Sequence, residues 1–247
     1  MKQLKFFLYF FMGCAMITSC GNKHKSDCND IFADKANGAL YWEALVEIAK
    51  KNKAQALEVV KSIRLNRQAH TLFDWQKNIP TNIDDFFDKF FVASMSRDPQ
   101  TLSKLGLFEI IGIREHNAYL NNVSPESMLC DLQDNVESLN VLKSYSVDSL
   151  SDEQKVSYKV FVWLLEHVVS GEKFIFHNYK INQMFGILSD LTMVFTEIHP
   201  LKFAKDVDTY IARLGRIPKQ LNQAIQLLEY QKSMGIIPPA FALEKNN

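Results

Sequence analysis

From residue 31 onward, hydrophobic residues recur every three or four positions, the spacing that places them on one face of an α-helix. No alternation of apolar and polar residues is long enough to supply the strands of a sheet. No repeat of about 20–50 residues is visible either, which argues against a solenoid. The sequence therefore predicts an all-α fold, an irregular multi-helix array over residues 31–247.

Several helix starts are marked by side chains that can satisfy the open backbone groups of a first turn. Asn82 precedes a predicted helix over residues 83–94 with acidic residues in its first turn. Ser124, followed by proline, has the pattern of a second start. Ser151 and Gln154 are three apart, as in a capping box, and begin a helix that is expected to end near Gly171.

Three further helices are predicted, over residues 36–50, 54–67 and 205–233. The last contains Pro218, which lacks the N–H that a helix interior needs, so a break is expected near Arg216. Between residues 172 and 188 the pattern loosens, and 174–176 are expected to be extended.

Three groups of apolar residues recur at helical spacing. The first group, predicted to be core, is Phe86, Phe87, Phe90 and Phe91. The second, predicted to be the buried face of the helix after Ser151, is Val156, Val160, Trp163, Leu164 and Val168. The third, a stripe along 205–233, is Val207, Ile211, Leu214, Leu221, Ile225 and Leu228.

The N-terminus has the pattern of an export signal. Two lysines precede an apolar run over residues 6–17, which is shorter than the ~20 residues of a membrane-spanning helix. The run ends in Ile17-Thr18-Ser19-Cys20, which resembles a bacterial lipobox. We therefore expect a lipoprotein signal peptide over 1–19, a lipidated Cys20, and a flexible tether over 20–30. The alternatives are an ordinary signal peptide or a buried apolar start of the fold.

A lipid on Cys20 would hold the protein on a membrane. Gly21 rather than aspartate follows the lipidated residue, which favours the outer membrane of the bacterial cell envelope, with the protein facing the periplasm. Export permits a disulfide between Cys28 and Cys130, and two separate thiols fit the sequence equally well.

Charge and histidine spacing exclude several functions. The 28 basic and 28 acidic residues cancel and no basic block occurs, so we expect no nucleic-acid partner. No two of the six histidines lie three or four apart, so the HExxH zinc arrangement is absent, and no P-loop or GxSxG motif occurs. The residues indicate no catalytic side chain, metal ligand or cofactor in this chain.

One polar segment has unusual neighbours. Residues 179–186 place the adjacent amides Asn182 and Gln183 among apolar residues and end in glycine. An amide pair can hold a peptide backbone, and a structural loop whose amides find internal partners fits equally well. Arg213 is expected to be a surface or capping residue.

Five motifs follow one another in order along the chain: Asp98-Pro99, Leu105-Gly106, Tyr179-x-Ile181-Asn182-Gln183-x-x-Gly186, Tyr210-x-x-Arg213-Leu214-x-x-x-Pro218 and Gly235-Ile236-Ile237-Pro238-Pro239. This ordered series resembles the amino-terminal part of the bacterial domain-of-unknown-function 885 proteins, over roughly residues 82–245. The resemblance implies an all-helical lipoprotein of a zinc-peptidase family of the gluzincin type. It also implies that Tyr179, Asn182 and Gln183 face a substrate cleft.

In that family an HExxPGH-like zinc motif lies in the carboxy-terminal half, and the present sequence contains no such motif. The resemblance therefore implies a truncated member, inactive alone, with zinc expected only in full-length proteins and a separately encoded carboxy-terminal half as a possible partner. Its apolar helix stripes would then be exposed. The alternative is a stand-alone helical lipoprotein that binds peptides or supports the envelope.

Overall fold

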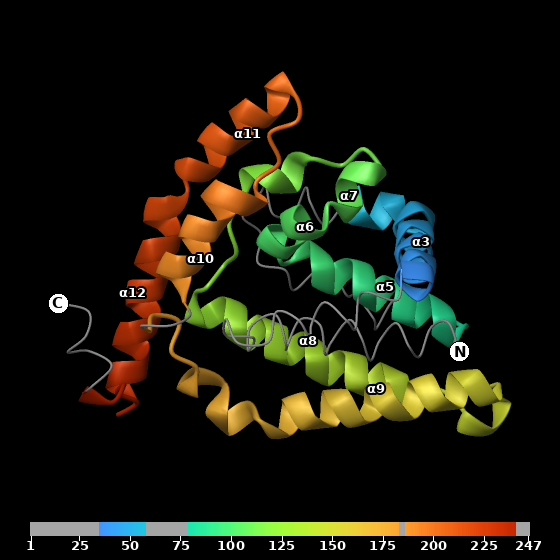
Figure 1. The fold of residues 1–247 in the computed structure, drawn as a ribbon. Helices are drawn as coiled ribbons and strands as arrows, with labels where there is room; N and C mark the ends of the chain where they lie inside the picture. The colour runs from blue at the N-terminus through green and yellow to red at the C-terminus, as the bar shows by residue number, and fades with distance from the viewer. Residues whose placement is uncertain (1–34, 58–78, 183–185, 241–247) are drawn as a thin grey trace.

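The computed structural model describes residues 35–57, 79–182 and 186–240, and no strand occurs among them (Figure 1). The elements are α3 (Lys35–Lys51), α5 (Ile83–Ser96), α6 (Pro99–Leu105), α7 (Leu107–Ile110), η2 (Glu115–Ala118), α8 (Pro125–Lys143), η3 (Val147–Ser149), α9 (Asp152–Ser170), η4 (Glu172–His177), α10 (Ile187–Met193), η5 (Val194–Ile198), α11 (Ala204–Leu214) and α12 (Ile217–Ser233). The all-α prediction is confirmed. None of the described helices has the length and apolar content needed to cross a membrane.

The predicted helix starts are confirmed by their capping bonds. The side chain of Asn82 accepts from the N–H of Asp84 (3.0 Å) at the start of α5. Ser124 caps α8 in the same way. Ser151 and Gln154 form a reciprocal capping box at α9, with bonds of 3.0 and 3.3 Å.

The predicted break in the last helix is also confirmed. α11 ends at Leu214 and α12 begins at Ile217. Pro218 therefore lies in the first turn of α12, where its missing N–H removes no helical hydrogen bond. Gly235, with φ of 75°, follows the end of α12.

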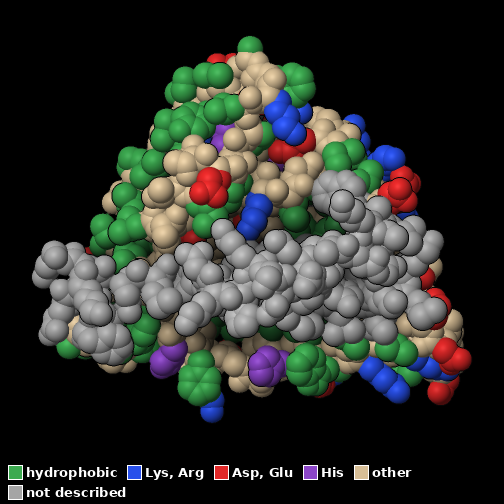
Figure 2. Space-filling model, in the orientation of Figure 1, with side chains coloured by type: hydrophobic (Ala, Val, Ile, Leu, Met, Phe, Trp, Pro, Cys, Tyr) green, Lys and Arg blue, Asp and Glu red, His purple; other side chains and the backbone are tan. Residues whose placement is uncertain are grey.

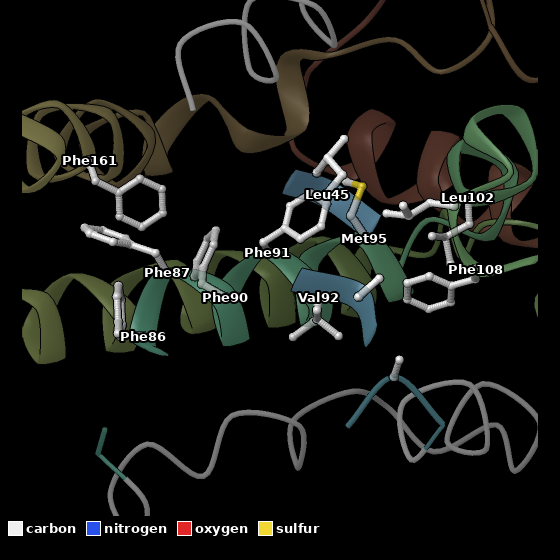
Figure 3. Packing of buried hydrophobic residues seen from close by; sticks show 14 of the residues in the cluster. Leu45, Phe86, Phe87, Phe90, Phe91, Val92, Met95, Leu102, Phe108 and Phe161 are labelled. Atoms are coloured by element: carbon white, nitrogen blue, oxygen red, sulfur yellow. The ribbon is translucent and has the colours of Figure 1, made fainter. Parts of the chain in front are cut away.

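The larger core forms around α5, whose four phenylalanines are buried against α3, α8 and α9 (Figure 3). The ring of Phe161 on α9 stacks edge-to-face on Phe90 and Phe87, with centroids 4.9 and 5.5 Å apart. Phe86 meets Tyr145 in the same geometry. The prediction that this aromatic group is core is confirmed.

The predicted buried face of α9 is wrong for Val156, Trp163 and Val168, which are exposed, whereas Leu164 is partly buried against the core. The fully buried side chains are instead Ser157, Phe161 and Leu165. Apolar residues occupy more than one face of this helix, so spacing alone does not choose between the faces. The aromatic cluster on α5 decides, because it accepts the ring of Phe161.

The segment after α9 differs from its predicted conformation. Residues 174–176 are not extended: they lie in η4, a 3₁₀ helix whose first turn is closed by Phe174 N–H bonding to Gly171 O (2.8 Å). The helix expected over 54–67 is described only to residue 57, and the leader, Cys20 and the tether over 20–30 lie outside the described residues.

The helices α10, α11 and α12 form a second, thinner layer, in which α12 meets α8 and α11 meets η2 (Figure 1). Its core is small: Ile187 and Leu191 of α10 and Ala224 of α12 are the buried members. Many other apolar side chains of this layer remain exposed, and Figure 2 shows them along the edge formed by α11 and α12.

Candidate functional site

The predicted polar segment connects η4 to α10, and the structure describes its residues 179–182 and 186. The carbonyl of Lys180 accepts from the N–H of Ile187 (2.9 Å), which joins the two ends of the loop. Gly186 adopts φ of 156°, and a Cβ there would lie 2.6 Å from the carbonyl oxygen of Lys180. Any other residue at 186 would force the loop open, so the glycine is a requirement of this closure.

The loop is fixed to the end of α12. Tyr179, half-buried, donates its hydroxyl to the carbonyl of Ile237 (3.1 Å). The buried amide of Gln231 donates to the carbonyl of Phe176 (2.5 Å) just before the loop. Two motif segments distant in sequence, 179–186 and 235–239, therefore meet in space.

The charge of Lys180 acts on two neighbouring helices. Burial raises the pKa of Asp131 on α8, and Arg97 opposes the rise more than Lys180 does. Burial also raises the pKa of Asp190 on α10, where Lys180 is the first opposing charge.

The structure describes two of the three predicted substrate-facing residues. Asn182 is exposed, and its amide nitrogen donates to the carbonyl of Tyr179 (3.2 Å). Gln183 lies outside the described residues. The loop thus presents an exposed amide on a fixed backbone, which is an arrangement able to hydrogen-bond an extended peptide.

The prediction that Arg213 is a surface residue is wrong, because its side chain is completely buried. Its guanidinium donates to Ser103 Oγ (2.7 Å) and to the carbonyl of His116 (3.1 Å). Burial lowers the pKa of Arg213 to about 10, and Glu109 opposes that change. The arginine therefore stays charged at neutral pH.

The buried cation is balanced by a polar cluster from η2 and α7. Asn117 donates to Glu109 Oε1 (2.9 Å) and accepts from Ser103 Oγ (2.5 Å), and His116 Nε2 lies 3.2 Å from the same Glu109 oxygen. Burial would raise the pKa of Glu109, but His116 and Asn117 outweigh it and lower that pKa. These residues come from separate elements, so their spacing in sequence gave no signal of the cluster.

The described residues do not fit a zinc site. Residues 35–57, 79–182 and 186–240 contain no group of three or more His, Cys, Asp or Glu that could hold a metal ion. The pair of His116 and Glu109 supplies only two donors, and the guanidinium of Arg213 adjoins it as a competing cation. The pair acts instead as the counterpart of the buried arginine.

Comparison with known proteins gives one match. The model of a family described as "Bacterial protein of unknown function (DUF885)" matches residues 99–246, more than half of the chain. The matched stretch contains the polar loop, the buried Arg213 and all three helices of the thin layer. No curated protein and no solved structure matches significantly.

Proposed function

The chain belongs to the bacterial DUF885 family, and from that premise we propose that it is the substrate-holding helical part of a lipid-anchored, metallopeptidase-like envelope protein. Its zinc ligands would lie outside residues 1–247, in a second part that completes the enzyme. The sequence supports this division because it has no HExxH arrangement, and alone the chain is then inactive.

The observation that carries the proposal is the anchoring of the described residues 179–182 and 186. The ends of this segment are joined by the bond from Ile187 to Lys180, and Tyr179 ties it to Ile237. Its described amide, Asn182, is exposed. An exposed amide on a backbone held at both sides loses little entropy on binding, which suits Asn182 to hold an extended peptide for cleavage by a neighbouring centre.

The test measures zinc content, peptide binding and cleavage for the full chain in neutral lipid nanodiscs, with a fluorescein-labelled casein digest as probe. We expect binding without zinc or cleavage, and binding weakened severalfold by Asn182→Ala. The matched control is Asn222→Ala, which removes an exposed asparagine from α12. Zinc with cleavage by this chain alone would overturn the proposed division.

The second half of the test adds a protein fragment that carries an HExxPGH motif, taken from the DNA downstream of this reading frame. Restored cleavage supports a split enzyme. A downstream region without such a motif favours the alternative, a stand-alone helical peptide-binding or structural lipoprotein.

Anchoring is tested separately through Cys20. Replacing it by serine removes the thiol that would carry the lipid. We expect Cys20→Ser to abolish incorporation of labelled palmitate, whereas Cys28→Ser should leave it unchanged. Equal labelling of both variants would contradict lipidation at Cys20.

A further inference from the structure

The ring of His199 connects the end of η5 to the first turn of α11. The backbone N–H of His199 donates to the carbonyl of Val194 (2.9 Å) and closes η5. Its ring Nε2 lies 3.1 Å from the carbonyl oxygen of Asp206, and the ring packs edge-to-face on Tyr210 with centroids 5.1 Å apart. His199 is 8% exposed. A buried contact between two helices is therefore made by a side chain that can bind a proton near neutral pH.

The contact with Asp206 decides which ring nitrogen carries the hydrogen. A carbonyl oxygen only accepts hydrogen bonds, so Nε2 of His199 donates, and the neutral ring then has no hydrogen on Nδ1. Nδ1 is buried and has no hydrogen-bond partner among the residues that the structure describes. A further proton would bind at Nδ1 and create a buried, charged N–H without an acceptor. Burying such a donor is unfavourable, so the folded arrangement favours the neutral ring.

The charged groups that face His199 come from two helices. Burial has the largest influence and lowers the pKa of His199 from its ordinary value of 6.5. Arg213 on α11 also lowers this pKa, whereas the bond to Asp206, the charge of Asp206 and the charge of Glu109 on α7 raise it. The carboxylate of Asp206 is already paired with Arg114 (3.2 Å), so it offers a second cation little attraction.

α11 lies at the edge of the molecule and is held there mainly by polar contacts (Figure 1). Its buried residues are Asp206 and Arg213, whereas Val207 and Ile211 are 49% and 61% exposed. Arg213 forms its hydrogen bonds near the end of the helix, so the first turn depends on the contacts of Asp206. A change at His199 therefore acts on a part of α11 that has little apolar burial to hold it in place.

We propose that His199 is a pH-sensitive switch that holds the first turns of α11 against η5 at neutral pH and releases them when acid protonates its ring. The ring binds a proton more readily in the released state than in the held state. The held state is therefore fully stabilised above the ordinary pKa of 6.5, and this stabilisation is lost as the pH falls toward the lower pKa of the held ring. The proposal does not depend on peptidase activity or on peptide binding.

The test measures amide hydrogen–deuterium exchange by mass spectrometry on the full chain in neutral nanodiscs, at about pH 7.5 and about pH 5.5. The rates are corrected for the intrinsic effect of pH on amide exchange. At about one unit below the ordinary pKa, a released ring is about 90% protonated. The opening of residues 204–211 should therefore increase severalfold, by at most about tenfold. Exchange in α5, which lies in the aromatic core, should stay unchanged.

The matched variants are His199→Gln and His177→Gln. Glutamine keeps an N–H that can donate to the carbonyl of Asp206, and it binds no proton in this pH range. His177 is an exposed histidine of η4 and serves as the control. We expect the opening of α11 to lose its pH dependence in His199→Gln and to keep it in His177→Gln.

A second measurement needs no variant. Exchange of the imidazole C2 hydrogen, read from the peptide that contains His199, follows protonation of that ring. We expect a pKa below 6.5 for His199, and a pKa at or above that value would overturn the proposal.

Three results of the amide experiment would also overturn it. A pH-independent α11 in the unchanged chain would mean that there is no switch. The same pH dependence in His199→Gln would mean that another group responds, such as the buried His116. An equal increase of exchange in α5 would mean that acid loosens the whole molecule rather than α11.

Discussion

The helices α5 and α11 differ in the face that each one buries: α5 buries apolar side chains and α11 buries charged ones. α5 buries its apolar face, including Phe86 and Phe90, against α3, α8 and α9. α11 buries Asp206 and Arg213 and leaves Ile211 in solvent. The comparison shows that apolar periodicity predicts a helix and a face, but not whether that face is turned toward the protein's own core.

The difference has a physical basis in what each helix meets. α5 meets aromatic rings that exclude water and need no directional bonds. α11 packs on η2 and reaches α6, where the carbonyl of His116 and the hydroxyl of Ser103 accept hydrogen bonds that Arg213 donates. Buried polar groups are tolerated only when they are hydrogen-bonded or paired. Specific hydrogen bonds and ion pairs therefore hold α11 in place, whereas the burial of apolar surface holds α5.

The largest loss of stability is expected from a substitution in the aromatic cluster of α5. Phe90→Ala removes a buried ring that contacts Phe161 and should lower the free energy of unfolding by about 3–5 kcal/mol. Chemical denaturation followed by circular dichroism measures it. Phe174→Ala, at a position 57% exposed, is the control and should change stability by less than about 1 kcal/mol. Similar losses in both variants would show that the α5 cluster is not the main core.

Removing the buried Arg213 of α11 should lower the free energy of unfolding by nearly as much. Arg213→Met leaves Ser103, the carbonyl of His116 and the charge of Glu109 without their buried partner, so we expect a loss of about 3 kcal/mol. The exposed Lys219→Met serves as the control in the same denaturation assay. Adding Glu109→Gln to Arg213→Met should recover part of the loss, and a double variant that is less stable still would contradict this balance of charges.

Asp206 should show a smaller effect that depends on pH. Burial would raise its pKa, but the N–H groups of Lys202 and Phe203 (2.9 Å each) and the side chain of Arg114 outweigh burial and lower it. Because the folded pKa is below the unfolded one, the stabilisation is complete above the ordinary value of 3.8 and is lost as pH falls through the folded pKa.

Asp206→Asn should therefore cost about 1–2 kcal/mol at neutral pH, since charge-assisted bonds become neutral ones. Melting temperatures measured between pH 7 and acid check this. The variant and the unchanged chain should converge as the pH falls, and parallel curves would contradict the role given to the carboxylate.

The smallest effect is expected on the outer face of α11. Ile211→Gln removes an apolar side chain that is 61% exposed, so stability should change by no more than about 0.5 kcal/mol. The same denaturation assay measures it beside Phe90→Ala. A loss of several kcal/mol would show that α11 is packed like α5, and the contrast between the two helices would fail.

Much of the fold could be predicted from local signals. The capping residues Asn82, Ser124 and Ser151 located three helix starts, and Pro218 located the break between α11 and α12. The buried face of α9 could not be predicted, because its apolar residues cover more than one side and a neighbour's ring made the choice.

The candidate site was only partly predictable. The loop over residues 179–186 could be found from its amides and glycine, and its described part is irregular as expected. Its attachment to Ile237 depends on a contact between elements that are distant in sequence. The burial of Arg213 was missed because a sequence shows the cation but not the acceptors that arrive from η2 and α6.

The sequence by itself determined that the chain is helical, where several of its helices begin and end, and which family it belongs to, because these follow from local spacing, caps and ordered motifs. Only the tertiary structure decided which face of each helix is inward. That choice depends on what the neighbouring elements offer: aromatic rings for α5, and carbonyl and hydroxyl acceptors for Arg213 of α11.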